Sequence, residues 1–95
     1  MSRKPIFGWS VWMGEAEREL LGRRVEVRDG EHVYVRRAPR ARSARVALAE
    51  FLLDTDYSDA TGRLVITCTI VAADGRVVDE ADITIGAGGV IEAAR

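Results

Sequence analysis

The chain has 95 residues, of which 47% are hydrophobic and 31% charged, and 14 Lys and Arg against 15 Asp and Glu leave a net charge of -1. This length supports one hydrophobic core, so we expect a single domain over residues 1–95 and no room for most catalytic domains. The lone Cys68 and the lone His32 exclude an internal disulfide and a zinc site built from Cys and His alone, and we expect no metal and no cofactor.

The N-terminal sequence lacks the marks of an export signal. MSRKPIFGWSVWM, residues 1–13, has a basic start and a short apolar run, but charged residues follow at once and no small-residue cleavage site is recognisable. No apolar stretch approaches the roughly 20 residues of a membrane span. We therefore expect an unprocessed cytoplasmic chain without a membrane partner.

Aromatic residues crowd the same segment. Trp9 and Trp12 could stack on a ligand or anchor a partner, but a lid over the end of a small core is the more frequent use of such residues. We interpret residues 1–13 as an aromatic arm and keep both tryptophans as candidate pocket residues. The following strong helix formers, with acids in the first turn and Gly22 as a stop, predict a helix over residues 14–22.

Alternating valines predict a β-hairpin over residues 23–36. A two-residue Asp29-Gly30 turn would divide the valines between the two faces. A three-residue loop over 28–30 with a left-handed glycine puts four of them on one face: Val25, Val27, Val33 and Val35. Because burial sets register, we predict the three-residue loop, which turns His32 outward opposite Glu26. A solvated cross-strand contact explains that pair better than an acid–base dyad.

Five arginines lie between residues 35 and 45, in the sequence VRRAPRARSAR. Residues 1–45 carry eleven basic and six acidic side chains, whereas residues 46–95 carry three and nine. The arginines do not alternate with aromatic residues as single-strand binding platforms do, so nucleic acid is the less favoured partner. An acidic protein, or the acidic half of a second copy, fits better, and a homodimer is expected. The candidate anion or acidic-partner site consists of Arg36, Arg37, Arg40, Arg42 and Arg45.

The stretch from 41 to 54 is rich in Ala, Arg, Leu and Glu, which favours a helix with Ser43 as its cap, although a strand remains an alternative. The expected buried stripe consists of Val46, Ala49 and Leu53, with Leu48 and Leu52 beside it. The polar sequence DTDYSDATG that follows predicts a loop.

Residues 63–95 predict a three-stranded antiparallel meander. A two-residue Asp74-Gly75 turn would join the first two strands, and a glycine turn over 86–89 would lead to a third strand over 90–94. The register implied by the first turn gives five cross-strand pairs: Ala72–Val77, Ile70–Asp79, Cys68–Ala81, Ile66–Ile83 and Leu64–Ile85. One face of this hairpin is then apolar except for Asp79.

Asp79 is the most informative single residue of the sequence. A carboxylate that faces a core must be paired, hydrogen-bonded, protonated or placed at the mouth of a cavity. It is thus a candidate pocket residue together with Cys68 on the same face, and an ion pair with an arginine is the structural alternative. Cys68 itself is expected to be a buried filler and not a nucleophile.

The sequence ADGRVVDEADITIGAGGVIEA, residues 73–93, resembles the last strands of the nuclear-transport-factor-2-like cone fold, in which a hairpin is followed by a glycine turn and a final strand. It equally resembles the small β-sandwich segment that opens amidohydrolases, although their His-x-His metal motif is missing. The first resemblance implies a small-molecule-binding or isomerase-like cavity containing Asp79.

Together these patterns predict an α+β fold with the order helix, β-hairpin, helix, three-stranded antiparallel meander, its curved sheet packed on a helix. The favoured function is a small cytoplasmic binding or assembly module that self-associates, with no catalytic residue and no enzymatic activity. Two alternatives stay open: an isomerase-like domain with Asp79 in its cavity, and a nucleic-acid-binding accessory protein that uses the segment from Arg36 to Arg45.

Overall fold

The computed structural model describes residues 8–11, 18, 20–30 and 32–94. Their elements, in chain order, are β1 (Ser10–Val11), β2 (Arg24–Arg28), β3 (Val33–Arg37), α2 (Ala44–Leu53), β4 (Leu64–Val71), β5 (Val77–Ile85), the short 3-10 helix η1 (Ala87–Gly89) and β6 (Ile91–Ala94). The helix expected over 14–22 falls largely outside the described residues, as does Trp12. Within the described part of the chain, α2 is the one α-helix, where two were expected.

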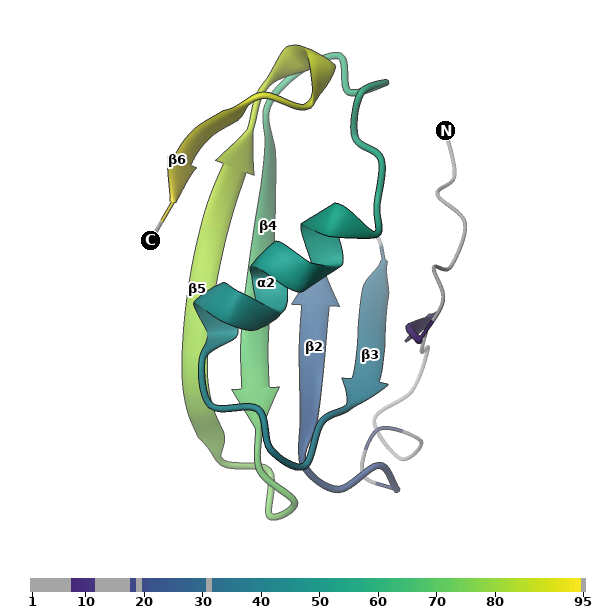
Figure 1. The fold of residues 1–95 in the computed structure, drawn as a ribbon, viewed down its shortest axis with the longest axis vertical. Coiled ribbons are helices and arrows are strands. Elements are labelled where there is room, and N and C mark those ends of the chain that lie inside the picture. Colours follow the sequence, from purple (N-terminus) through teal and green to yellow (C-terminus); the bar gives the residue numbers. More distant parts are fainter. Residues whose placement is uncertain (1–7, 12–17, 19, 31, 95) are drawn as a thin grey trace.

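The strands form a single six-stranded antiparallel sheet in the order β1-β3-β2-β4-β5-β6. The hairpin and the meander that the sequence predicts are joined through β2 and β4, where residues 24–28 pair with residues 67–71. α2 crosses one face of this open sheet (Figure 1). The molecule is thus a small α+β domain, as expected. Among the described residues, no helix is long and apolar enough to span a bilayer.

The register of the β2–β3 hairpin differs from the prediction. Val27 lies opposite Tyr34, and the Asp29 N–H donates to the His32 carbonyl at 3.1 Å, so the predicted three-residue loop is wrong. Tyr34 faces the core and is 1% exposed. Val35, on the other face of the sheet, is also 1% exposed, so this register buries the large Tyr34 ring in the core without exposing that valine. Glu26 therefore lies opposite Val35 and not opposite His32.

Alternation predicts the β4–β5 pairing almost completely. Four of the five expected pairs are present, from Leu64–Ile85 to Ile70–Asp79. The turn is wrong, because the Ala72 N–H donates to the Arg76 carbonyl around a three-residue loop with a left-handed Gly75. The register then shifts by one residue between Ile70 and Val71, where Val77 replaces the expected partner.

The predicted helix is present, and Ser43 caps it by accepting a hydrogen bond from the Val46 N–H at 3.2 Å. Its buried face is not the predicted one: Val46 is 57% and Leu53 86% exposed. The buried residues are Ala44, Ala47, Leu48 and Phe51. Phe51 is the largest apolar side chain of the helix, and its contacts with the rings of Trp9, Tyr34 and Tyr57 fix which face turns inward.

Candidate functional site

The loop between β3 and α2 is held by backbone and arginine hydrogen bonds. Ala38, Pro39, Arg40 and Ala41 form a turn in which the Ala41 N–H donates to the Ala38 carbonyl at 3.2 Å, with proline in its favoured second position. The Arg23 guanidinium donates from two nitrogens to the Ala41 carbonyl, at 3.1 Å from Nε. Arg40 in this turn and Arg42 after it are therefore carried on a loop anchored to the start of β2.

This loop encloses an open hollow of about 500 Å³ lined by Arg23, Pro39, Arg40 and Arg42, which we name the arginine hollow. Arg40 and Arg42 are exposed, and neither has an ion pair among the described residues. A guanidinium presents a planar fork of N–H donors that matches the oxygens of a carboxylate or a phosphate. The hollow can therefore bind an anionic group without first breaking an internal ion pair of Arg40 or Arg42.

The other three predicted arginines do not line this hollow. Arg36 stacks on the Trp9 ring, with 4.4 Å between its Cζ and the ring centroid, and its Nη2 lies 2.7 Å from a carboxylate oxygen of Glu50. This side chain covers the core and is already paired. Arg37 and Arg45 are exposed, at the end of β3 and in the first turn of α2. The basic segment thus divides into a hollow and separate surface groups.

Asp79 faces the core side of the sheet, where its Oδ2 accepts a hydrogen bond from the Ala44 N–H at 2.8 Å. A carboxylate at this position satisfies a free N–H of the first turn of α2 and complements the helix dipole. The partner is thus helix backbone, where the sequence suggested an arginine. Asp79 is not among the described residues that line the arginine hollow, the cavity at Tyr57 or the hollow at Asp82.

The remaining predicted pocket residues are Cys68, Trp9 and Trp12. Cys68 is 0% exposed, and burial, followed by the negative charge of Asp79, raises the pKa of its thiol to about 12 against an opposite effect of Arg36. Trp9 is buried with its ring edge-on to Phe51, 5.1 Å between centroids. Cys68 and Trp9 thus belong to the core, and Trp12 lies outside the described residues.

A buried contact between Asp29 and Tyr57 is not predicted from the sequence. The Tyr57 hydroxyl donates to Asp29 Oδ2 at 2.9 Å, and the Asp29 side chain is 4% exposed. His32 Nδ1 lies 3.6 Å from the other carboxylate oxygen. The one signal in the sequence is a tyrosine inside an otherwise polar loop, since an aromatic ring there suggests docking onto the core. The contact fastens this loop to the turn of the β2–β3 hairpin.

Near the loop, a second cavity of about 280 Å³ is lined by Leu52, Thr55, Asp56, Tyr57, Ser58, Ile85, Gly88, Gly89 and Ile91. Its walls come from the end of α2, the loop that follows it, the end of β5, the turn before β6 and the first residue of β6. The Gly88 N–H donates to the Ala60 carbonyl at 2.9 Å and so ties that turn to the loop. The cavity contains none of the predicted site residues.

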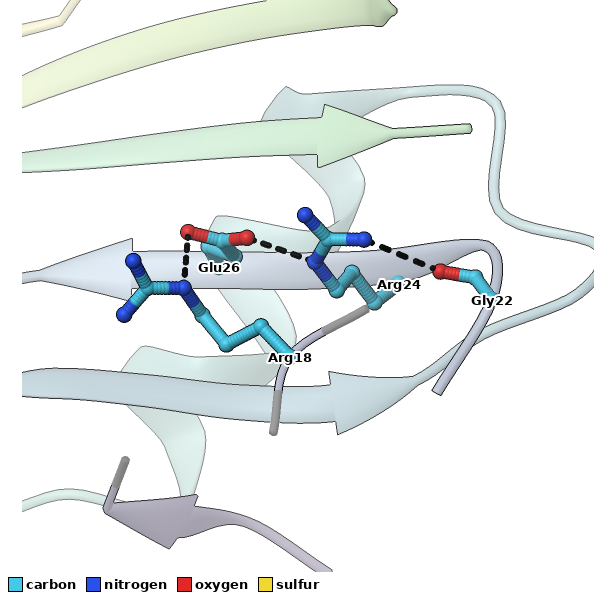
Figure 2. A network of polar contacts seen from close by, with 4 residues as sticks. All are labelled: Arg18, Gly22, Arg24 and Glu26. Atoms are coloured by element: carbon cyan, nitrogen blue, oxygen red, sulfur yellow. Dashed lines mark hydrogen bonds and ion pairs between the residues drawn. The ribbon is translucent and has the colours of Figure 1, made fainter. Parts of the chain in front are cut away.

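The sheet face opposite α2 carries a polar network over β2. Figure 2 shows Glu26 between Arg24 and Arg18, with 2.6 Å from Arg24 Nε and 3.6 Å from Arg18 Nε to its carboxylate oxygens. Arg24 also donates to the Gly22 carbonyl at 3.2 Å. Arg24 is only 7% exposed, so the network is a fixed part of the fold in which both arginines already contact a carboxylate.

No protein-family model, curated protein or solved structure matches this chain.

Proposed function

We propose that the protein is a non-catalytic binding and assembly module that takes acidic side chains of a protein partner into the arginine hollow. The observation that carries the proposal is the pairing of an anchored loop with exposed arginines whose charge is not neutralised within the described residues. Preorganised guanidinium groups lose less freedom when they bind a carboxylate. A cytoplasmic location goes with the proposal, since Cys68 is a free buried thiol.

The two alternatives have weaker support. Stacking on bases needs exposed aromatic rings beside the basic groups, and the described rings of Trp9, Tyr34, Phe51 and Tyr57 are buried. An isomerase-like cavity needs a carboxylate directed at a ligand, whereas Asp79 accepts from the helix backbone. Binding of acidic groups is the function that the exposed guanidinium groups support best.

The test compares two double variants that remove the same charge. Arg40→Gln with Arg42→Gln changes the hollow, and Arg28→Gln with Arg76→Gln changes two exposed arginines outside it. Fluorescence anisotropy with a labelled oligoglutamate peptide should show a loss of affinity of about tenfold or more for the first variant, and at most about twofold for the second. Added salt should weaken binding to the wild-type protein.

Equal losses in both variants would show that the hollow has no special role. Tighter binding of an oligonucleotide than of the peptide, lost only in the hollow variant, would replace the proposal by the nucleic-acid alternative. Far-ultraviolet circular dichroism of each variant checks that the fold is retained.

A further inference from the structure

The sheet face opposite α2 carries exposed side chains over β4, β5 and β6, and we name this part of the face the outer face. It consists of Val65, Thr67, Thr69, Val78, Glu80, Asp82, Thr84 and Ala93. Val65 is 54% and Val78 36% exposed, in contrast to the buried Arg24 of the β2 network on the same side. A sheet face that combines exposed valines, threonines and carboxylates is suited to contact with another protein.

Two carboxylates of the outer face have no cationic partner among the residues that the structure describes. Glu80 and Asp82 are two residues apart on β5 and lie opposite Thr69 and Thr67 of β4. Neither forms an ion pair with a described residue, whereas three glutamates elsewhere do: Glu26, Glu50 and Glu92. Asp82 also borders a hollow of about 260 Å³ with Val65, Thr84 and Ala93. The outer face therefore offers negative charge beside apolar surface.

The arginine hollow and the outer face complement each other but do not pair within one copy. The loop of the hollow leads into α2, on the opposite side of the sheet (Figure 1). Successive residues of β5 point to opposite sides of the sheet. The Asp79 carboxylate accepts a hydrogen bond from the first residue of α2 on one side, and its neighbour Glu80 belongs to the outer face on the other. No described ion pair joins the hollow to Glu80 or Asp82.

We propose that the partner of the arginine hollow is the outer face of a second copy of this chain, with Arg40 and Arg42 of one copy against Glu80 and Asp82 of the other. The inference rests on the proposed function and names its partner. Each copy has a net charge of -1, so long-range repulsion between copies is small and local complementarity decides the contact. Such a contact joins two different surfaces, and it gives a dimer if two reciprocal contacts close, or larger species if they do not.

The test is a charge exchange followed by sedimentation velocity. One variant carries Arg40→Glu and Arg42→Glu, and the other Glu80→Arg and Asp82→Arg. The wild-type protein should associate with rising concentration in low salt and dissociate in high salt. Each variant alone should remain monomeric, because both surfaces of a copy then carry the same sign. An equimolar mixture should associate again, because every altered surface finds an opposite one.

A control variant carries Arg45→Glu and Asp54→Arg at the two ends of α2, which are outside both surfaces, and it should associate like the wild type. The neutral pair Glu80→Gln and Asp82→Asn gives a milder second variant if the charge-reversed β5 fails to fold. A monomeric wild-type protein in low salt, or a mixture that stays monomeric, would overturn the inference.

The two proposals fail separately. If the wild-type protein is monomeric yet binds oligoglutamate through Arg40 and Arg42, the proposed function holds and the second copy is the wrong partner. If the peptide does not bind but the mixture associates, the hollow is specific for the outer face and the broader proposal is wrong. Association that survives changes at Glu80 and Asp82 but not at the arginines would place the partner surface elsewhere.

Discussion

Replacing Tyr57 by Phe should destabilise the fold by removing the hydrogen bond from the Tyr57 hydroxyl to Asp29. The phenyl ring keeps its place beside Phe51, 6.5 Å between centroids, so no large cavity forms. What is lost is the 2.9 Å bond to Asp29 Oδ2, between side chains of a 4% exposed tyrosine and a 4% exposed aspartate. A hydrogen bond to a charged group contributes on the order of 2 kcal/mol to the free energy of unfolding.

For a domain of this size, such a loss lowers the melting temperature by on the order of 10 °C. Urea unfolding followed by tryptophan fluorescence and circular dichroism gives the free energy of unfolding directly. The control is a double-mutant cycle with Asp29→Ala, in which Tyr57→Phe should have almost no further effect. A cost under about 0.5 kcal/mol, below the usual range for hydrogen bonds, or an equal cost in the Asp29→Ala background, would refute the reasoning.

Three further predictions concern single side chains. Cys68 should react slowly with thiol reagents in the native protein. Folding raises the pKa of its thiol from 9.0 to about 12, so its contribution to the free energy of unfolding should be complete below pH 9 and should decline as the pH rises above 9. The variant Cys68→Ala should not show this decline. Gly89→Ala should lower the melting temperature more than Gly88→Ala, because both glycines have positive φ but only a Cβ at Gly89 would approach a backbone oxygen, at 2.9 Å. Asp79→Ala should cost about 1 kcal/mol in a urea titration, and Asp79→Asn, which keeps an acceptor for the Ala44 N–H, should cost less; equal costs would mean that this hydrogen bond is not the cause.

The strand pairs of the meander could be predicted because β4 and β5 are long and alternate regularly, so one register buries the whole apolar set. The turns could not. Gly30 and Gly75 both follow an aspartate and both have positive φ, yet the three-residue loop predicted at Gly30 and the two-residue loop predicted at Gly75 are both wrong. An Asp-Gly pair marks the position of a reversal, while the burial of more distant side chains such as Tyr34 decides its register.

The buried face of α2 could not be predicted from the sequence for a related reason. Apolar residues occur all round this helix, so its periodicity is ambiguous, and the position of Phe51 among the rings of three other segments settles the phase. Arginine density marks the basic segment in the sequence, but it does not predict how the arginine side chains divide between different surroundings. Arg23 joins the hollow from outside the segment, and Arg36 leaves it for Trp9 and Glu50. Contacts between distant segments leave no local pattern.

The position of β2 between β3 and β4 has a consequence for biosynthesis. Its pairing with β3 is local, but its other edge is completed only by residues 67–71, which are made after α2. Until then a growing chain exposes a valine-rich strand edge, the kind of surface on which neighbouring nascent chains aggregate. Closure of this long loop should also limit the refolding rate, so this domain should refold more slowly than a helical bundle of equal length.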